Sequence, residues 1–486
     1  MKLSEMTFRR KFSLNLYKSL SCPLAEMTFT TDFTDTVRGD LYPIIKKTEG
    51  TEETVLHEGY RVKGSATRLF AAFFPYATYK MTVGELCGSA GFVFSAPATS
   101  CAVKARPTDS GREIAIAHEG GEETLALPEK CSGVFEMIVS LRPGHFDIFY
   151  CVSGVIDYLG SFCVPSFKDS TRNDFYQSAK VFVSLEDAFI TKVSSCVDCG
   201  NGQADIRPLK YENGDVIIES GRVFLTLSVR LIQGGYQAVV SWVPGTLDFK
   251  MEGALFYAAD DDRIHGDVAS AIVLDRRDGV WHLWQRSGAC GHVLAYTSFK
   301  SDIRYGINVI DVTGLPHMTG ADIDDTLFLG KKGDEDPEFI YDEKTKKWLF
   351  CLCRVTEATH KYQYYFFESD RPDSGYKWIG CGPAGEETGG SIVKHEGKLY
   401  FVCGNSFSAK SDYRVYEWGK FDEFTNLVTD YPDGGFRGWG TIIPVNVGTR
   451  RRYYWLTFDR FLTSKIYNWS YGNVYCFEAE GIFKPE

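Results

Sequence analysis

The segment Glu335-Asp-Pro-Glu-Phe-Ile-Tyr-Asp342, followed after a short turn by Lys347-Trp-Leu-Phe-Cys-Leu-Cys353, shows the pattern that decides the fold. A polar opening leads into an apolar strand, a turn and an aromatic-rich second strand. Similar openings recur roughly every 50 to 70 residues, which suits a repeated unit of about four strands. The five openings are Asp205-Ile-Arg-Pro208, His265-Gly-Asp267, Asp334-Glu-Asp-Pro337, Glu387-Thr-Gly-Gly-Ser391 and Arg437-Gly-Trp-Gly440.

Five such units predict a five-bladed β-propeller over residues 201–486. Radial repetition protects the edges of the sheets and directs the first strand of every blade toward the central axis. The openings, which are distant in the sequence, are therefore expected to share one site, and we predict that this is the catalytic domain.

The first 200 residues have a different pattern. From about Thr28 to Val193, short apolar alternations are separated by Gly, Pro and Asp turns, as in Val134 to Leu141 and Phe146 to Val152. This pattern is typical of an all-β sandwich. The predicted fold class is all-β, with a jelly-roll-like accessory sandwich at 1–200 followed by the propeller.

Composition excludes several function classes. The chain of 486 residues has a net charge of −11, which disfavours nucleic acid as a partner. No apolar run is long enough to span a bilayer, and Asn15 and Lys18 interrupt the run that a signal peptide would need after Arg9-Arg-Lys11. The 14 scattered cysteines favour a cytoplasmic protein. Cys196-Val-Asp-Cys199 has the spacing of half a zinc site without a second half, so we predict no metal at this pair and no cofactor.

Carboxylates at the openings indicate glycosidic bond cleavage. This reaction needs one carboxylate as base or nucleophile and one carboxylic acid that protonates the leaving oxygen. Asp205, Asp336 and Glu387 each lie at or beside the start of a predicted strand. We therefore predict that these three residues form the catalytic group and that the partner is an oligosaccharide or small glycoside.

From Ala204 to the C-terminus the sequence resembles the five-bladed propeller hydrolases that include glycoside hydrolase family 43 and the invertase and levanase families. The matching segments are Ala204-Asp-Ile-Arg-Pro208, Glu335-Asp-Pro-Glu-Phe-Ile-Tyr-Asp342 and Glu387-Thr-Gly-Gly-Ser-Ile-Val-Lys394 with Gly397-Lys-Leu-Tyr400. The resemblance implies that Asp205 activates water, Asp336 tunes the acid and Glu387 protonates the leaving group. It also implies an exo-acting enzyme on furanosides or related pyranosides.

This sequence departs from the family pattern at one place. In the arabinanase-type pattern a Glu directly precedes the Gly-Pro pair, whereas here Thr388 precedes Gly389-Gly390. The acid is then Glu386 or Glu387, of which Glu387 is favoured. Asp334 and Asp267 are rival carboxylates, and any of these acids can instead cap backbone N–H groups.

Further polar and aromatic side chains near the openings are suited to binding sugar hydroxyls and ring faces. The predicted binding residues are Arg207, Arg230, His265, Asp267, Arg354, Arg437 and Trp439. Arg230 and Arg354 end similar strands, so a structural ion pair between blades is as good an interpretation of these two residues as sugar binding. His265 and His317 are open as contacts for an ion on the axis.

Two other functions stay open at this stage. A phosphorylase or transglycosidase would use the same fold with phosphate or a sugar as the acceptor. A noncatalytic propeller would bind glycan or protein with purely structural carboxylates. The sequence does not indicate the sugar, the stereochemical outcome or the oligomeric state.

Overall fold

The computed structural model describes residues 2–27, 44–56, 59–288, 290, 293–312, 334–355, 362–383, 385, 387–405, 413–429, 436–447, 450–459 and 473–481. The protein is all-β, as predicted, with one short α-helix among these residues. The chain divides into two compact units: a sandwich unit, Ser21–Asp198, and a propeller unit, Met1–Leu20 with Cys199–Glu486. None of the described helices has the length and apolar composition of a membrane-spanning helix.

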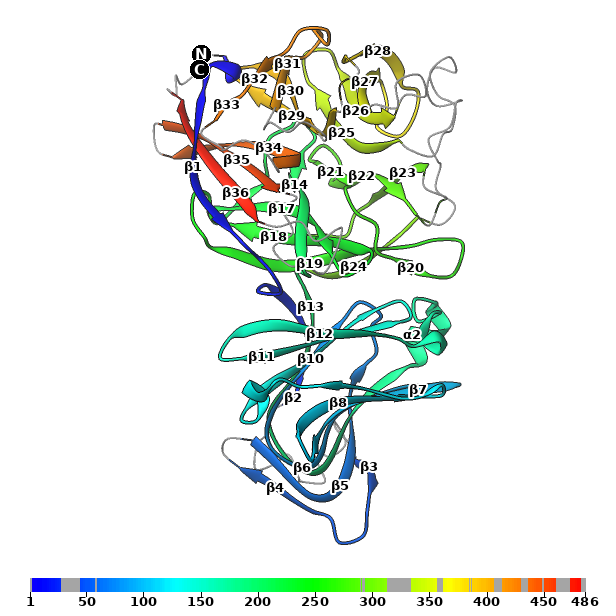
Figure 1. The fold of residues 1–486 in the computed structure, drawn as a ribbon. Helices are drawn as coiled ribbons and strands as arrows, with labels where there is room; N and C mark the ends of the chain where they lie inside the picture. The colour runs from blue at the N-terminus through cyan, green and yellow to red at the C-terminus, as the bar shows by residue number, and fades with distance from the viewer. Residues whose placement is uncertain are drawn as a thin grey trace. The chain divides into compact units, whose positions relative to one another are not determined.

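The sandwich unit is built on one 12-stranded sheet whose two longest strands bend (Figure 1). Residues 78–83 of β6 pair with β10, whereas residues 90–96 pair with β7, so each half of β6 belongs to a different layer. Gly88 lies at the bend, where an added Cβ would come within 2.4 Å of the carbonyl oxygen of Glu186. Both layers contribute to one core that includes Val103 and Phe146, as expected for strands that switch between packed layers.

The strands of this unit are β2 (Ser21–Met27), β3 (Ile44–Lys47), β4 (Glu52–Leu56), β5 (Gly59–Ala72), β6 (Thr78–Ala96), β7 (Thr99–Thr108), β8 (Gly111–His118), β9 (Gly121–Ala126), β10 (Phe135–Arg142), β11 (His145–Val152), β12 (Val155–Cys163) and β13 (Lys180–Asp198). Short helices are η3 (Glu129–Cys131), η4 (Pro165–Phe167) and α2 (Asn173–Ser178).

The described residues of the propeller unit form five sheets, which we number 1 to 5 along the chain. Each sheet contains the predicted aromatic-rich second strand as β17, β22, β26, β30 or β35. Sheet 1 comprises β14 (Gly202–Pro208), β16 (Ile218–Glu219), β17 (Arg222–Arg230), β18 (Gly235–Trp242), β19 (Phe249–Ala258), β20 (Ile264–His265) and β24 (Gly306–Asp311). Sheet 2 comprises β15 (Lys210–Tyr211), β21 (Ala271–Asp275), β22 (Val280–Ser287) and β23 (Val293–Phe299).

The remaining strands follow the same scheme. Sheet 3 comprises β25 (Glu335–Asp342), β26 (Lys347–Val355), β27 (Tyr362–Ser369) and β28 (Lys377–Cys381). Sheet 4 comprises β29 (Glu387–His395), β30 (Lys398–Asn405), β31 (Tyr413–Glu417) and β32 (Thr425–Asn426). Sheet 5 comprises β33 (Val428–Thr429), β1 (Thr7–Leu14), β36 (Val474–Gly481), β35 (Arg450–Asp459) and β34 (Phe436–Val447).

Buried side chains join the five sheets into a closed ring. Separate core clusters connect sheets 1 and 2, sheets 2 and 3, sheets 3 and 4, and sheets 4 and 5. The ring closes where Ala204 of sheet 1 packs against Phe458 of sheet 5. A closed ring of radially packed sheets is the propeller arrangement, in which the first strands surround the axis.

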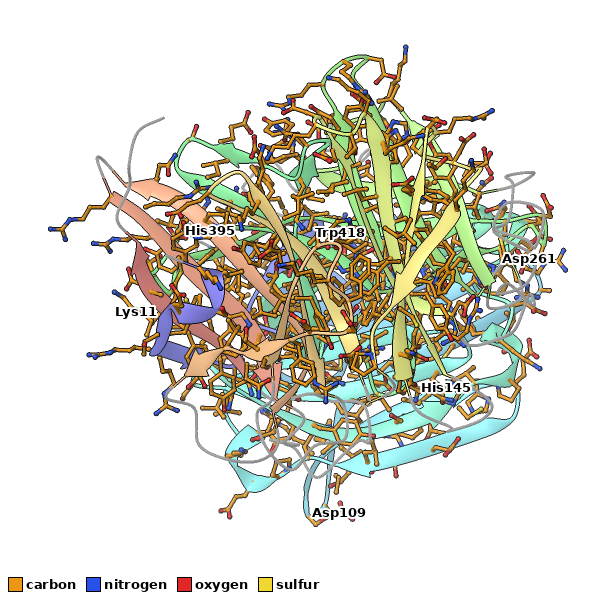
Figure 2. The ribbon with its side chains drawn as sticks, turned by 90° about the horizontal axis from the view of Figure 1, so that it is seen from above. Lys11, Asp109, His145, Asp261, His395 and Trp418 are labelled. Carbon is orange, nitrogen blue, oxygen red and sulfur yellow. The ribbon has the colours of Figure 1, made fainter. Side chains whose placement is uncertain are left out.

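The first 20 residues correct the predicted division at residue 200, because they belong to the propeller unit. Strand β1 pairs with β36 and β33 and so lies inside sheet 5, where Figure 1 shows the blue strand beside the red one. Its Phe8 is fully buried against Trp455, and Lys11, which Figure 2 labels, forms an ion pair with Glu478 at 2.7 Å. The boundary predicted between 200 and 201 lies two residues from the observed one, between Asp198 and Cys199.

Candidate active site at the starts of the first strands

One residue at the start of each of sheets 1 to 4 has a left-handed backbone conformation. These residues, which we call the turn positions, are Asp205 (φ 51°), Ala269 (φ 61°), Asp336 (φ 51°) and Gly389 (φ 62°). In sheets 1, 3 and 4 the pairing between first and second strands shifts at this point, as a β-bulge does. Side chains at the three turn positions that are not Gly are disfavoured sterically, which suggests that the two aspartates serve a purpose there.

The turn positions align the neighbouring residues of the four sheets. The residue before each turn position, the outer position, is Ala204, Val268, Glu335 or Thr388. The residue two places before each turn position, which we call the inner position, is Gln203, Asp267, Asp334 or Glu387. Because side chains alternate along a strand, these two positions direct their side chains to opposite sides.

The turn-position aspartates of sheets 1 and 3 lie within electrostatic reach of one another. The carboxylate of Asp205 accepts a bond from Arg230 at 3.2 Å, and the Asp205 side chain is 15% exposed. Asp336 accepts hydrogen bonds from the hydroxyl of Thr388 at 2.6 Å and the backbone N–H of Gly389 at 2.9 Å. Burial and the charge of Asp205 raise the pKa of Asp336. The structure therefore brings these two predicted residues within electrostatic reach of one another.

Glu335, at the outer position of sheet 3, adds a third carboxylate that the sequence analysis did not select. Arg286 of β22 bonds to it at 3.0 Å, and Tyr362 of β27 donates a second hydrogen bond. Its side chain is 25% exposed. Burial and the charge of Asp336 raise the pKa of Glu335 to about 7, with a smaller contribution from Asp205.

Glu387, the predicted acid, has different surroundings, because it lies at the inner position. It is 0% exposed, and its carboxylate accepts hydrogen bonds from Arg414 at 2.9 Å and from Tyr416, both on β31 of its own sheet. Burial raises the pKa of Glu387. The outer position of sheet 4 is occupied by Thr388, whose hydroxyl faces Asp336.

The side chains at the inner positions of sheets 2 and 3 also form hydrogen bonds within their own sheet or at its strand ends. Asp334 forms a two-point ion pair with Arg354 of β26, at 2.6 and 2.8 Å. Asp267 accepts hydrogen bonds from the hydroxyl of Ser287 and the backbone N–H of Gly288. These contacts fit the alternative reading of both aspartates as anchors of strand ends. Glu387, at the inner position of sheet 4, follows the same pattern, because its partners Arg414 and Tyr416 belong to its own sheet.

The predicted binding residues are not all gathered at one place. Arg230 contacts Asp205, whereas Arg207 is almost fully buried and reaches Glu338 at 3.4 Å and the carbonyl of Pro337. His265 bonds to Asp261 at 3.0 Å in the connection between β19 and β20. For Arg437 and Trp439 only the backbone of β34 is described, and Glu386 and His317 lie outside the described residues.

A buried charge cluster lies among the first strands beyond Asp336. The ammonium of Lys210 bonds to Glu338 of β25 at 2.7 Å and to the carbonyl of Ile392 in β29 at 2.8 Å. Glu338 also faces Arg207, so two cations share this buried carboxylate. Lys210 thus links sheets 2, 3 and 4 beneath the candidate site.

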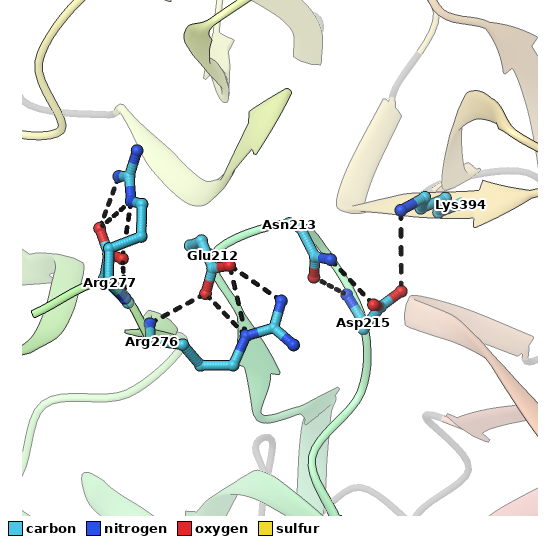
Figure 3. A network of polar contacts seen from close by, with 7 residues as sticks. Glu212, Asn213, Asp215, Arg276, Arg277 and Lys394 are labelled. Atoms are coloured by element: carbon cyan, nitrogen blue, oxygen red, sulfur yellow. Dashed lines mark hydrogen bonds and ion pairs between the residues drawn. The ribbon is translucent and has the colours of Figure 1, made fainter. Parts of the chain in front are cut away.

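The opposite ends of the same first strands carry a hollow of about 270 Å³. Trp418 and several lysines line it, but Lys398 is paired with Glu417 at 3.4 Å and Lys344 bonds to the carbonyl of Gly397. Figure 3 shows a network of paired polar side chains that includes two residues that line the hollow, Asn213 and Lys394. In that network Glu212 binds Arg276, and Asp215 faces Lys394 at 3.9 Å. The unusual backbone and the clustered carboxylates favour the other ends of the strands as the active site.

Within the described part of the chain, one group of side chains has the spacing of metal ligands. It consists of Asp275, Asp278 and His282 at the hairpin between β21 and β22. Asp275 is already neutralised by Arg277 at 2.6 Å, and burial lowers the pKa of His282. The group lies at the end of β21 that is opposite the turn position Ala269.

No family model and no curated protein matches the chain. Among solved structures, the chain is similar to a thermostable family-43 glycoside hydrolase, with 14% identity over 59% of this chain and 95% of that one and a TM-score of 0.37. A family 117 glycoside hydrolase from Zobellia galactanivorans has 10% identity over 57% and 84% of the two chains and a TM-score of 0.39. The catalytic domain of a GH62 α-L-arabinofuranosidase from Coprinopsis cinerea has 10% identity over 57% and 91%, with a TM-score of 0.37. Similarity at this level does not define an activity.

The place of Glu335 in the repeat depends on backbone conformation, which the sequence pattern does not show. Glu335 directly precedes Asp336, just as Thr388 directly precedes Gly389. Aligning the openings on the turn positions, rather than on the nearest Glu, places Glu335 and Thr388 in the same position of consecutive sheets. That alignment requires the positive φ values, which hydrophobic periodicity does not reveal.

Proposed function

We propose that this protein is a glycoside hydrolase whose water-activating base is Asp205, with Asp336 beside it. The observation that carries the proposal is the pair of aspartates at equivalent left-handed positions of sheets 1 and 3, held by Arg230 and by Thr388 with Gly389. Two carboxyl groups in electrostatic contact, in a partly exposed site, are the chemical requirement for acid–base cleavage of a glycosidic bond.

The proposed reaction uses one carboxylic acid as proton donor, the Asp205 carboxylate as base and one water molecule. The leaving oxygen takes a proton from a carboxylic acid as its bond to the anomeric carbon breaks. Water adds to that carbon and gives its proton to the Asp205 carboxylate. Proton exchange with solvent then restores both carboxyl groups. Asp336 favours protonation around it, because its charge opposes ionisation of neighbouring acids.

The substrate class follows from the resemblance of the openings to the family 43 and invertase-type hydrolases. We propose an exo-acting enzyme on small arabinosides, fructosides, xylosides or related pyranosides. Buried thiols such as Cys351 and Cys353 in the core of sheet 3 fit a chain that works in the reducing cytoplasm.

The test is hydrolysis of aryl arabinofuranosides, fructosides, xylosides and galactosides by the wild type and by Asp205→Asn and Asp336→Asn. We expect turnover of at least one sugar by the wild type and a loss of kcat of about 10² to 10⁴-fold in each variant, the usual contribution of a general acid or base. Glu343→Gln, at an exposed residue of the β25–β26 turn, is the matched control and should keep wild-type rates.

Unfolding midpoints within about 2 °C of the wild type would show that a lost rate reflects chemistry rather than folding. The proposal fails if the wild type cleaves none of the substrates. Sugar binding without turnover, unchanged in Asp205→Asn, would then identify a noncatalytic glycan-binding propeller.

A further inference from the structure

A glycosidase with Asp205 as base also needs a proton donor, and the inner-position Glu387 is poorly placed to be one. Its side chain is completely buried, and Arg414 and Tyr416 occupy one carboxylate oxygen. Burial raises the pKa of Glu387, but its position disfavours it as the donor, because Arg414 and Tyr416 hold the carboxyl group inside the sheet, away from a substrate oxygen. A substrate oxygen could reach it only after this part of sheet 4 had opened.

Outer positions have the orientation that Glu387 lacks. Thr388 in sheet 4 directs its hydroxyl back to Asp336 of the preceding sheet. Glu335 occupies the same position in sheet 3 and likewise reaches back to the preceding sheet, where it meets Arg286 of β22. The repeat thus places one ionisable side chain at an outer position of these four sheets, and that side chain is Glu335.

We propose that Glu335, rather than Glu387, donates the proton to the leaving oxygen. This inference rests on the glycosidase function proposed above. In the reaction, the proton leaves the Glu335 carboxyl group, the bond between the anomeric carbon and the leaving oxygen breaks, and the alcohol departs. The Glu335 carboxylate is left beside Arg286 and Tyr362 and regains a proton from solvent.

The surroundings of Glu335 suit this role. Burial opposes its ionisation most strongly, followed by the charges of Asp336 and Asp205, whereas Arg286 favours ionisation and Tyr362 donates a hydrogen bond to the ionised form. Cys353 lies directly across from it on β26 and stays a neutral thiol, because burial raises the pKa of Cys353 far above its usual value. The resulting pKa of about 7 leaves the acid protonated near neutral pH and able to lose its proton.

The experiment compares leaving groups. A 2,4-dinitrophenolate departs without a proton, whereas a simple alkoxide does not. Glu335→Gln should therefore lose about 10² to 10⁴-fold in kcat/KM for a methyl or disaccharide substrate of the productive sugar, but only about tenfold or less for its dinitrophenyl glycoside. The wild-type kcat/KM should fall as pH rises through about 7, where Glu335 ionises, and this fall should be absent in Glu335→Gln.

Glu387→Gln is the contrasting variant. We expect a lower unfolding midpoint, since Arg414 loses its partner, with the wild-type dependence on leaving group and pH. The inference is overturned if Glu335→Gln behaves as the wild type, if its loss is equal for all leaving groups, or if Glu387→Gln shows the acid signature instead. These outcomes all presuppose wild-type turnover, whose absence would reject the glycosidase proposal itself.

Discussion

At the scale of single residues, the candidate site depends on a buried ion pair between Lys210 and Glu338, which connects the first strands of neighbouring sheets. Lys210 is 4% exposed and touches Glu338 and the carbonyl of Ile392, on the first strands of sheets 3 and 4. A buried ammonium is tolerated only when its bonds are satisfied, because desolvating it is expensive. Lys210 and Glu338 therefore fix the spacing of the strands that carry Asp336 and Thr388.

Replacing Lys210 by Met tests this role. The variant leaves the buried carboxylate of Glu338 with Arg207 at 3.4 Å as its remaining cation. We expect a loss of about 3 kcal/mol in the free energy of unfolding, near the lower end for breaking a buried ion pair. Urea unfolding followed by tryptophan fluorescence measures it.

The control is Lys377→Met at an exposed position of β28, which should change stability by no more than about 0.5 kcal/mol. If Lys210→Met unfolded at the same urea concentration as Lys377→Met, the buried ammonium would contribute nothing to the fold.

The same scale shows what the sequence could and could not predict at the site. Asp205 and Asp336 are predictable from the sequence because each stands at an opening followed by an apolar strand, and the structure brings them within electrostatic reach of one another. The resemblance favours Glu387 as the acid, and the sequence does not single out Glu335, because alternation along a strand cannot locate a bulge. A shift of one residue exchanges the outer and inner positions, and so exchanges a partly exposed carboxyl group, Glu335, for a fully buried one such as Glu387.

At the scale of elements, the last sheet is completed by the first strand of the chain. β1 lies between β36 and β33, so the N-terminal strand covers an edge that the C-terminal strand would otherwise expose. The five second strands were predicted from their aromatic composition. β1 is not predictable in this way, because its short run of Phe8 to Leu14 contains three consecutive basic residues. Nothing in this run indicates a partner strand that is 469 residues away at the Arg9–Glu478 pair.

Phe8→Ala is the test for this closing strand. Phe8 is 0% exposed and meets Trp455 edge to face at 6.0 Å. Truncating a buried Phe costs about 3 to 5 kcal/mol, so the thermal midpoint of the propeller unit should fall by roughly 5 to 10 °C. Arg9→Ala, whose side chain is exposed in the same strand, should leave the midpoint within about 1 °C. Differential scanning calorimetry on both variants decides, and equal midpoints would exclude β1 as a stabilising strand.

At the scale of the whole molecule, the sandwich unit interrupts the propeller unit in sequence. The chain leaves the propeller unit after Leu20 and returns at Cys199, and the backbones of these two residues are hydrogen-bonded to each other. The N–H of Cys199 donates to the carbonyl of Leu20 at 2.9 Å, and the N–H of Lys18 donates to the carbonyl of Gly200 at 2.8 Å. The two crossing points therefore already lie as close as the ends of a β-hairpin.

This arrangement predicts that residues 21–198 can be replaced by a two- to four-residue Gly-Asn turn, because such turns join adjacent antiparallel strands. The core clusters that connect the five sheets draw on residues 3–8 and 204–479, so the ring should form without the excised segment. We expect a monodisperse, cooperatively unfolding protein that keeps the wild-type kcat on the productive aryl glycoside. The matched control is residues 199–486 alone, which lacks β1 and should aggregate through the exposed edge of β36. A folded excision variant without turnover would instead assign part of the catalytic site to the sandwich unit, and an unfolded one would show that the propeller unit needs that segment to fold.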